Sequence, residues 1–320
     1  MFGRRYAGPI AVAPMGLCNL IAPGADAAIA AAAATANIPY CLSTAATTPI
    51  EEIARVAQGN LWFQLYVTSG DAVTFDLVQR AEQAGVEVLL VTVDVQTSAK
   101  RVRDLVNGLT LPMRPSAQTI ANLGLHPKWL IGNLRHGAPR FEMLAKYFHR
   151  EAGKLSHAAT TAKLLASGLL DWTTIERLLE RWPNTLVLKG LLDPVDAQRA
   201  AAIGVDGIVV SNHGGRQSDA APATIEMLPE FKDAVGQKLQ VLIDGGFRSG
   251  EDIVKAIALG ADMVLLGRPF LFGVAALGAN EGAARILSIL EEEIRTNAMF
   301  VGCRTIESIR TICVRQTSLL

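Results

Sequence analysis

The feature that most constrains this chain is a regular alternation of short apolar runs with longer amphipathic segments along most of its 320 residues. Short runs rich in β-branched and aromatic residues predict strands, and apolar residues that recur every three to four positions predict helices. Nearly every apolar run ends in a glycine or a polar residue. The predicted strands are Ile10–Ala13, Tyr40–Leu42, Trp62–Leu65, Val88–Thr92, Leu186–Lys189, Gly207–Val210, Val241–Ile243 and Met263–Leu266.

Helical periodicity fills most of the intervals between these runs. The predicted helices are Ala25–Ala36, Asp71–Ala84 with Asp71 as its cap, Thr173–Arg181, Pro194–Ile203, Ser249–Leu259 and a closing helix Glu281–Met299. Such βα repeats predict the α/β class and a (β/α)8 TIM barrel. A doubly wound sheet is the alternative, but polar residues after every strand suit the single active face of a barrel better. Because half of the residues are hydrophobic, one domain spanning residues 1–320 can bury a large core.

One interval, from about residue 96 to 170, breaks this rhythm and predicts a long insertion after strand 4. The insertion is basic and aromatic, with Lys128, Arg135, Arg140, Lys146, Arg150, Lys154 and Lys163 interleaved with Trp129, Phe141, Tyr147 and Phe148. It could be a solvated lid over the active face, or a surface that contacts an anionic membrane or a partner protein. Its histidines, His126, His136, His149 and His157, lack metal-ligand spacing and are interpreted as surface residues.

The overall charge argues against nucleic acid as a partner, because 30 basic side chains balance 30 acidic ones. Cys18, Cys41, Cys303 and Cys313 form no CxxC pair, so neither zinc nor a disulfide framework is predicted. Arg4-Arg5 and the apolar residues that follow, up to Ala25-Asp26-Ala27, resemble an export signal, but Pro9–Ala13 fits a first core strand. We therefore expect a cytoplasmic protein without a membrane-spanning helix, with peripheral membrane contact left open.

The residues after the predicted strands carry the chemistry. Ser211 to Gln217 (SNHGGRQ) places a base, two glycines and a guanidinium after one strand: His213 could take a proton, and Arg216 could bind a carboxylate. Arg248 and Arg268, beside Asp244-Gly245-Gly246 and Gly267, follow the last two strands, where barrels often bind phosphate. Neutral hydrogen-bonding groups on Ser43, Gln64 and Thr92, with a positive charge on Lys189, suit a flat heterocycle. Together these features predict FMN as the cofactor.

The same residues resemble a known family, the FMN-dependent α-hydroxy-acid dehydrogenases and oxidases, which includes glycolate oxidase, lactate oxidase and mandelate dehydrogenase. The similarity runs from Pro9 to about Ile309. The motifs that carry it are Ala13-Pro14-Met15-Gly16, Phe63-Gln64-Leu65-Tyr66-Val67, Thr92-Val93-Asp94, Leu188-Lys189-Gly190, Ser211 to Gln217, Asp244-Gly245-Gly246-Phe247-Arg248 and Gly267-Arg268-Pro269. Ser211 to Gln217 is highly specific to this family, whereas the Asp-Gly-Gly and Gly-Arg motifs also occur in other phosphate-binding barrels.

The resemblance implies oxidation of an L-2-hydroxy acid to the 2-oxo acid, with flavin N5 as hydride acceptor. His213 is then the base, Asp94 its partner and Lys189 the charge that stabilises reduced flavin. The residues implied to contact the substrate are Arg216, Arg101, Tyr66 and Ala45. Those implied to contact FMN are Ala13, Pro14, Met15, Ser43, Gln64, Thr92, Lys189, Ser211, Asp244, Gly246, Arg248, Gly267 and Arg268. Ala45 stands where glycolate-type relatives have a bulky aromatic, so a mandelate-like or lactate-like substrate is expected.

Two departures from the family pattern lead to further expectations. Family members usually carry several dozen residues before the segment equivalent to Phe2-Gly3, including a tyrosine that contacts the substrate; this sequence is expected to lack that segment and to have a looser substrate site. Ser218 replaces a larger apolar residue. A catalytically impaired flavin-binding scaffold, or another FMN- or phosphate-binding barrel enzyme, is therefore an alternative. The family also implies a homo-oligomer, and oxygen, a quinone or a protein carrier as electron acceptor.

Overall fold

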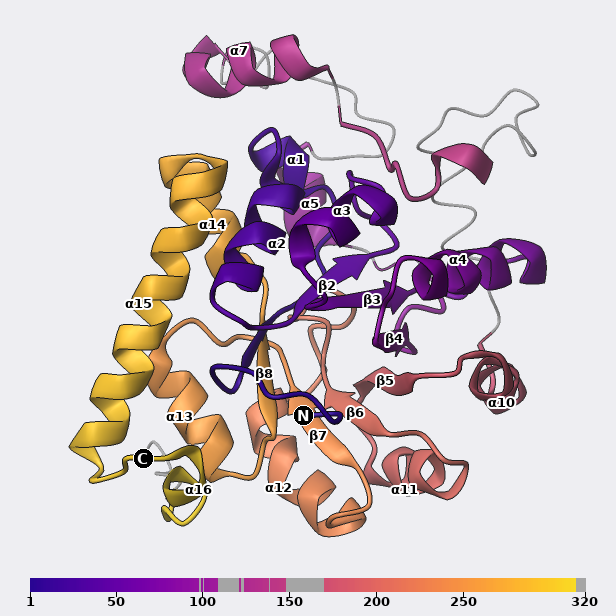
Figure 1. Ribbon diagram of the computed structural model, residues 1–320, viewed down its shortest axis with the longest axis vertical. Coiled ribbons are helices and arrows are strands. Elements are labelled where there is room, and N and C mark those ends of the chain that lie inside the picture. Colours follow the sequence, from indigo (N-terminus) through magenta and orange to yellow (C-terminus); the bar gives the residue numbers. More distant parts are fainter. Residues whose placement is uncertain are drawn as a thin grey trace.

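A closed barrel of eight parallel strands forms the centre of the molecule (Figure 1). The computed structural model describes residues 1–97, 99, 101–108, 121, 124–137, 139–147 and 170–314. The strands are β1 (Ile10–Val12), β2 (Tyr40–Ser43), β3 (Leu61–Leu65), β4 (Val88–Thr92), β5 (Thr185–Leu191), β6 (Gly207–Val210), β7 (Gln240–Ile243) and β8 (Met263–Leu266). Pairing of β1 with β8, with Ile10 opposite Val264, closes the ring. The predicted TIM barrel is confirmed.

Two apolar layers explain why these short runs become strands. Alternate residues point inward, where Trp62, Cys41, Leu90 and Met263 belong to a buried cluster that fills the barrel. The opposite faces of the strands pack with the surrounding helices in a larger cluster. Because both faces of each strand are buried, the strands read as continuous apolar runs, which is typical of parallel sheets.

The helices surround the barrel, with α15 running along one side of Figure 1. They are α1 (Cys18–Ile21), α2 (Ala25–Thr35), α3 (Ile50–Ala57), α4 (Asp71–Gln83), α5 (Val102–Val106), α7 (Pro127–His136), α10 (Trp172–Arg181), α11 (Pro194–Ala202), α12 (Thr224–Val235), α13 (Gly250–Ala258), α14 (Arg268–Leu277), α15 (Ala279–Phe300) and α16 (Ile306–Ile309). All six predicted helices are present, to within two residues at each end. Sequence periodicity missed the other described helices, which are short or contain a proline: α1, α3, α5, α7, α12, α14 and α16.

One capping prediction is wrong. Gly70, in extended conformation, occupies the N-cap of α4, and Asp71 is the first helical residue without a capping hydrogen bond. The Asp71 carboxylate instead pairs with Arg177 of α10 at 2.6 Å. At α13, by contrast, Ser249 is the N-cap and forms a capping box with Asp252. An acidic residue at a helix start therefore does not by itself identify the cap.

The insertion lies between β4 and β5, and no strand occurs in its described part. It contains α5 and α7, and α7 lies above α1 in Figure 1. Trp129 of α7 donates a hydrogen bond from Nε1 to the Leu20 carbonyl at 2.7 Å, which joins α7 to the end of α1. His126 and His136 are exposed, as expected. Phe148, His149, Arg150, Lys154, His157 and Lys163 lie outside the described residues.

The cysteines form no disulfide among the described residues. Cys18, Cys41 and Cys303 are buried and unbridged, and Cys313 is exposed and unbridged. Within the described ranges, no group of acidic, histidine or cysteine side chains is arranged to hold a metal ion. Among the helices that the structure describes, none has both the length and the apolar character needed to span a bilayer. The single-domain assignment stays a prediction.

Candidate active site

Polar residues at the carboxyl ends of β2 to β6 form two buried hydrogen-bonded groups that lie side by side in the sheet. Ser43 lies opposite Gln64 in the sheet, and Thr92 lies opposite Lys189. Ser43 Oγ donates to Gln64 Oε1 at 2.9 Å, and Gln64 Nε2 donates to Thr92 Oγ1 at 2.9 Å. Lys189 Nζ donates to Ser211 Oγ at 3.0 Å. The carboxyl end of the barrel is therefore lined by fixed neutral groups beside one buried ammonium.

Lys189 and Asp244 form a buried ion pair at this end of the barrel, with Nζ and Oδ2 2.9 Å apart. Burial alone would lower the pKa of Lys189, but the carboxylates of Asp244 and Asp94 together outweigh it and the pKa is raised, so the ammonium stays charged. The second carboxylate oxygen, Asp244 Oδ1, is buried and has no hydrogen-bond partner among the described residues. That oxygen can accept a hydrogen bond from a ligand hydroxyl.

His213 lies in the turn after β6 with a φ of 56°, in the left-handed region that non-glycine residues rarely adopt. Its Nδ1 is 3.0 and 3.1 Å from the two oxygens of Asp94. Its Nε2 is 3.4 Å from the Tyr66 hydroxyl, and the two rings are stacked. Ser211 Oγ accepts the backbone N–H of His213 at 3.1 Å, which helps to hold the turn. Because Asp94 occupies Nδ1, Nε2 is the nitrogen available to accept a proton.

Tyr66 presents a neutral phenol beside this imidazole. Burial raises the pKa of Tyr66 to about 12, although the nearby Lys189 ammonium opposes the shift. The hydroxyl therefore keeps its proton at neutral pH and can donate a hydrogen bond. Thr44 Oγ1 accepts the backbone N–H of Tyr66 at 3.0 Å and fixes its position after β3.

Two arginines lie at the outer edge of this group, and a carboxylate that the sequence analysis missed accompanies them. Arg216 Nη2 is 3.0 Å from Asp104 Oδ2, and Arg101 Nε donates to the Arg216 carbonyl at 3.4 Å. Burial and the nearby Arg216 lower the pKa of Arg101. Two cations and one carboxylate leave a net positive charge, which suits one further carboxylate from a ligand.

Positive charge also gathers after β7 and β8. Burial and the neighbouring cations Arg248 and Arg216 lower the pKa of Arg268, so an anion here would relieve repulsion. A Cβ on Gly214 would lie 2.8 Å from Arg268 Nη2, so glycine makes room for this side chain. Gly246 has a φ of 96° and open space where a Cβ would be, so a ligand can approach its backbone closely.

The two nearby helix starts differ in what they offer to an anion. At α13 the backbone N–H groups of Gly250 and Asp252 are already bound by Glu293 Oε2 and Ser249 Oγ. The start of α14 has no side-chain cap. However, Pro269 has no N–H and the Phe270 N–H donates to the Gly267 carbonyl at 3.0 Å. A phosphate near Arg248 and Arg268 would therefore be bound mainly by the two guanidinium groups, with the Arg268 N–H as the contribution of the start of α14.

The remaining predicted site residues lie where β1 and β8 end. A Cβ on Gly267 would lie 3.4 Å from Met15 Cγ and Sδ and 3.7 Å from Ala13 Cβ. A Cβ on Gly16 would lie 3.1 Å from Ala45 Cβ, so the motif that contains Pro14 packs closely against Ala45 in the loop after β2. The net positive charge, the open glycine backbone, the neutral hydrogen-bonding groups and the unpartnered Asp244 oxygen together fit FMN.

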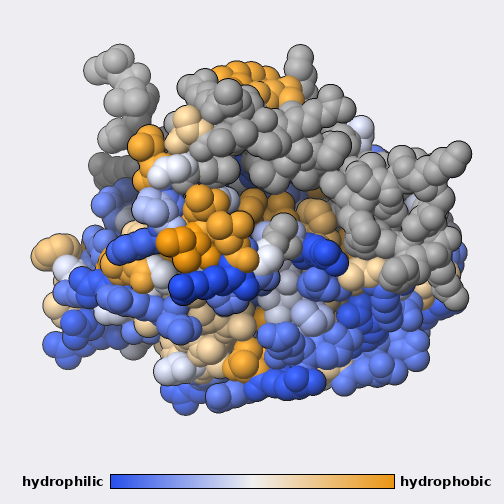
Figure 2. Space-filling model, turned by 90° about the horizontal axis from the view of Figure 1, so that it is seen from above, coloured by the Kyte–Doolittle hydropathy of each residue, from blue (hydrophilic) through white to orange (hydrophobic). Residues whose placement is uncertain are grey.

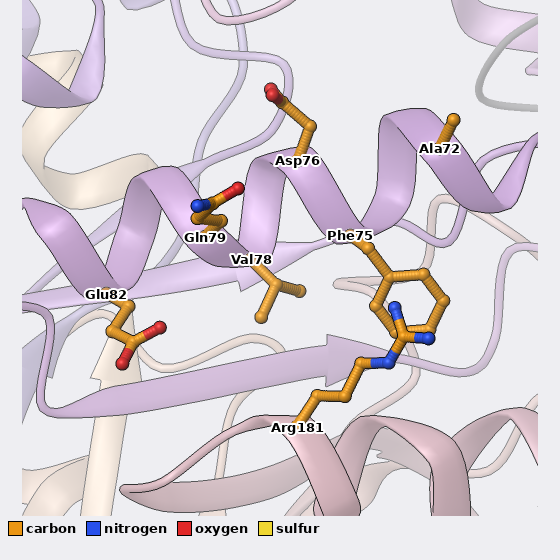
Figure 3. Close-up of a pocket in the computed structure, with 7 residues that line it drawn as sticks. All are labelled: Ala72, Phe75, Asp76, Val78, Gln79, Glu82 and Arg181. Carbon is orange, nitrogen blue, oxygen red and sulfur yellow. The ribbon is translucent and has the colours of Figure 1, made fainter.

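A surface hollow elsewhere on the molecule lacks the features of an active site (Figure 3). It is lined by α4 residues that include Phe75, Asp76 and Glu82, and by Arg181 of α10. The Arg181 guanidinium covers the Phe75 ring, 3.8 Å from its centroid. These lining residues come from the outer helices and include no base paired with a carboxylate. Tyr6 is also remote from His213, because it accepts a hydrogen bond from Trp62 near the start of β3.

Sequence reasoning missed Asp104, Gln217 and Thr44 as members of the site. Asp104 belongs to a run of charges that resembles a solvated surface. Gln217 Nε2 donates to the Asp94 carbonyl at 3.2 Å, and its Oε1 is buried without a partner among the described residues. The position of Gln217 at the end of the Ser211 motif was a usable signal, whereas nothing in the sequence distinguished Asp104.

Comparison with known proteins matches residues 1–316 to a family described as FMN-dependent dehydrogenase. (S)-Mandelate dehydrogenase from Pseudomonas putida is 40% identical over 309 residues, which are 97% of this chain and 77% of the relative. L-Lactate dehydrogenase from Xanthomonas campestris pv. campestris is 38% identical over 312 residues, which are 97% of this chain and 80% of the relative.

Solved structures give the same result. The structure of the monotopic membrane protein (S)-mandelate dehydrogenase has a TM-score of 0.90 at 39% identity, covering 97% of this chain and 81% of that chain. The structure of mandelate oxidase has a TM-score of 0.79 at 39% identity, covering 97% of this chain and 79% of that chain. The fold is therefore shared with these proteins along 97% of this chain.

Proposed function

Because this chain belongs to the FMN-dependent dehydrogenase family, we propose that it is an enzyme that oxidises an L-2-hydroxy acid to the 2-oxo acid. The observation that carries the proposal is the His213–Asp94 pair, with Nδ1 and Oδ1 3.0 Å apart and Tyr66 facing the other ring nitrogen. A base with its orienting carboxylate lies beside two arginines that can bind a substrate carboxylate. The two named relatives, a mandelate and a lactate dehydrogenase, support this reaction class.

FMN would be held by residues from most of the strand ends. Arg248 and Arg268 would bind its phosphate, and the free Asp244 oxygen would accept from a ribityl hydroxyl. The other residues expected to contact FMN are Ala13, Pro14, Met15, Ser43, Gln64, Thr92, Lys189, Ser211, Gly246 and Gly267. When bound, FMN supplies an acceptor for two electrons at N5.

Different side chains around the substrate would transfer its proton and hold it in position. His213 Nε2 takes a proton from the 2-hydroxy acid, and the Asp94 carboxylate stabilises the resulting imidazolium. The Tyr66 hydroxyl donates to a substrate oxygen, because its proton is retained at neutral pH. Arg216 and Arg101 bind the substrate carboxylate. The Lys189 ammonium provides fixed positive charge beside the ring.

The direct test is the visible spectrum of the purified protein before and after (S)-mandelate or L-lactate is added without oxygen. A yellow protein whose flavin band bleaches with a 2-hydroxy acid supports the proposal. A yellow protein that does not bleach with any 2-hydroxy acid favours the scaffold, or another FMN barrel enzyme. A colourless protein that does not take up added FMN contradicts both the cofactor and the reaction.

Ala45 leads to a prediction about substrate size. Its methyl group leaves space that a bulky aromatic would fill, so we expect kcat/KM for mandelate or lactate to exceed that for glycolate by about 10-fold or more. Each added methylene or ring contact in an apolar pocket contributes about 1–3 kcal/mol. Initial rates with a panel of 2-hydroxy acids measure this ratio, and a strict preference for glycolate contradicts it.

Arg216→Lys tests the carboxylate contact. Lysine keeps the charge but loses the planar fork, so we expect KM for the 2-hydroxy acid to rise by about 10- to 100-fold, with a smaller change in kcat. Steady-state kinetics provide both values. Arg304→Lys, at an exposed position outside the site, is the matched control and should leave KM unchanged. An unchanged KM in the Arg216→Lys variant would remove Arg216 from substrate binding.

The outer face of α7 supports peripheral contact with an anionic membrane. Ile131 and Leu134, which are 48% and 72% exposed, lie one turn apart on α7, with Lys128 and Arg135 on the same side. Figure 2 shows the molecule from above relative to Figure 1, the side on which α7 lies, with hydrophobic residues next to hydrophilic ones. An apolar strip flanked by cations is the pattern of an interfacial helix. The proposed location is therefore the cytoplasmic face of a membrane. That oxygen, a quinone or a protein carrier accepts the electrons, and that the protein forms a homo-oligomer, stay predictions.

Removal of this apolar strip should weaken membrane binding. We expect the double variant Ile131→Ser and Leu134→Ser to reduce sedimentation with vesicles containing anionic phospholipid by about 10-fold, because two large apolar side chains no longer enter the interface. Binding should also fall as salt is raised. Val195→Ser, an exposed apolar position on α11, is the control. Equal sedimentation of both variants with the vesicles would argue against α7 as the contact.

A further inference from the structure

A second carboxylate is completely buried outside the group around His213. Asp26, the second residue of α2, has no exposed surface. Its Oδ2 accepts two hydrogen bonds from Thr47, one from the backbone N–H at 3.0 Å and one from Oγ1 at 2.7 Å. Its Oδ1 accepts from the Tyr40 hydroxyl at 3.4 Å. In the described part of the chain no lysine or arginine forms an ion pair with it.

Such a carboxylate is costly, because a buried charge must be compensated by the groups around it. Its influence extends to its neighbours: burial, and then the Asp26 carboxylate, raise the pKa of the Cys18 thiol and of the Tyr40 phenol well above their usual values. Both groups therefore stay protonated. The compensation comes from hydrogen bonds, most of them from one loop.

That loop joins β2 to α3 and is bound from two sides. Asn19 donates from its backbone N–H to Thr47 Oγ1 at 3.1 Å and from Nδ2 to Thr48 Oγ1 at 3.1 Å. Asn19 Oδ1 also accepts the backbone N–H of Asp26 at 3.2 Å. Asp26, Asn19 and Thr47 thus form a closed network that fixes the far end of the loop.

The near end of the same loop contacts the proposed flavin and substrate site. Ser43 Oγ accepts the backbone N–H of Ala45 at 3.1 Å and donates to Gln64. Thr44 Oγ1 accepts the backbone N–H of Tyr66. The Ala45 carbonyl accepts the backbone N–H of Leu17 at 3.2 Å, just after the Ala13 to Gly16 motif. Residues 43–45 thus connect the ends of β1, β2 and β3, and Thr47 lies only two residues further along the same loop.

We propose that Asp26 is a positioning residue, whose buried carboxylate sets the conformation of the loop 43–48 and so holds Ser43, Thr44 and Ala45 against FMN and the substrate. The expected effect of Asp26 on the substrate rests on the proposed function. Its expected effect on FMN binding rests only on the geometry of the site. The Asp26 side chain itself lies behind the active site, where it binds the loop through Thr47, and would act on the site only through that loop.

The experiment compares Asp26→Ala, Asp26→Asn, Thr47→Val and Thr47→Ser. Alanine at position 26 and valine at position 47 remove the Asp26–Thr47 side-chain bond, whereas asparagine and serine can keep it. We expect the first two to weaken FMN binding by the apoprotein by about 10-fold or more and to lower kcat/KM for the 2-hydroxy acid, because valine removes one buried hydrogen bond to Asp26 and alanine removes all three. The conservative pair should stay within about threefold of the wild type. Quenching of flavin fluorescence measures FMN affinity without turnover.

Asp262→Ala is the matched control for a merely structural role. Asp262 also accepts a backbone N–H, from Val241 at 2.8 Å, but at the start of β7, at the opposite end of the barrel from the site. It should lower the unfolding midpoint and leave FMN affinity unchanged. If Asp26→Ala does not fold, the FMN affinities of Thr47→Val and Thr47→Ser test the proposal instead.

Wild-type FMN affinity in the folded Asp26→Ala or Thr47→Val variant overturns the proposal, as does an equal loss of affinity in Asp262→Ala. A yellow wild-type protein that oxidises no 2-hydroxy acid overturns the proposed function alone, because the affinity comparison still stands. A wild-type protein that binds no FMN overturns both.

Discussion

Replacement of His213 by asparagine lowers kcat for the 2-hydroxy acid by about 10²- to 10⁴-fold, the usual contribution of a positioned general base. Asparagine is smaller than histidine, but its amide N–H can replace Nδ1 beside Asp94, and it accepts no proton at neutral pH. The backbone N–H of residue 213 can still donate to Ser211 Oγ, and asparagine tolerates the positive φ of this turn. FMN should therefore stay bound, and the loss should appear in kcat rather than in flavin content.

The measurement is the rate of flavin reduction in a single turnover without oxygen, together with the flavin-to-protein ratio. His136→Asn, at an exposed histidine of α7, is the control and should retain the wild-type rate. A His213→Asn variant that reduces its flavin at the wild-type rate would exclude His213 as the base. Loss of flavin together with loss of rate would indicate that His213 mainly maintains the cofactor site.

Local sequence determined the strands well and some of the helices poorly. The bounds of β4, β6 and β8 agree with prediction at both ends, because strands buried on both faces are continuous apolar runs between glycine and polar residues. Helix α12 was missed because Pro229 lies inside it and weakens the helical pattern. Helix formation at such positions depends on packing against the barrel, which local sequence does not encode.

In the candidate site, too, local motifs predicted individual residues but not the contacts that depend on the closed barrel. His213 and Arg216 could be identified because one contiguous motif contains both, and Lys189 and Asp244 because each follows a strand. The pairing of Lys189 with Asp244 depends on barrel closure and could not be predicted from either motif. Asp26 was least accessible of all: between two alanines it resembled part of an export signal, yet the fold buries it behind the β2–α3 loop.

The buried pair gives the second large prediction, for Lys189→Met. Methionine leaves the Asp244 carboxylate buried without its cation, and breaking a buried ion pair in this way typically costs about 3–5 kcal/mol of unfolding free energy. Urea unfolding of the apoprotein measures the loss, because bound FMN would add its own stabilisation. Lys255→Met, which breaks the exposed pair with Glu251, is the control and should cost about 0.5 kcal/mol or less.

Adding Asp244→Asn to Lys189→Met separates the structural role of Lys189 from its proposed chemical role. With neither charge present, no uncompensated carboxylate is buried, so most of the lost stability should return. Turnover should not return, because the positive charge beside the ring is still missing; we expect kcat to stay about 10²-fold or more below wild type. If stability and kcat recovered together, Lys189 would serve only to neutralise Asp244. If neither stability nor kcat recovered, the ion pair would not be the source of the loss.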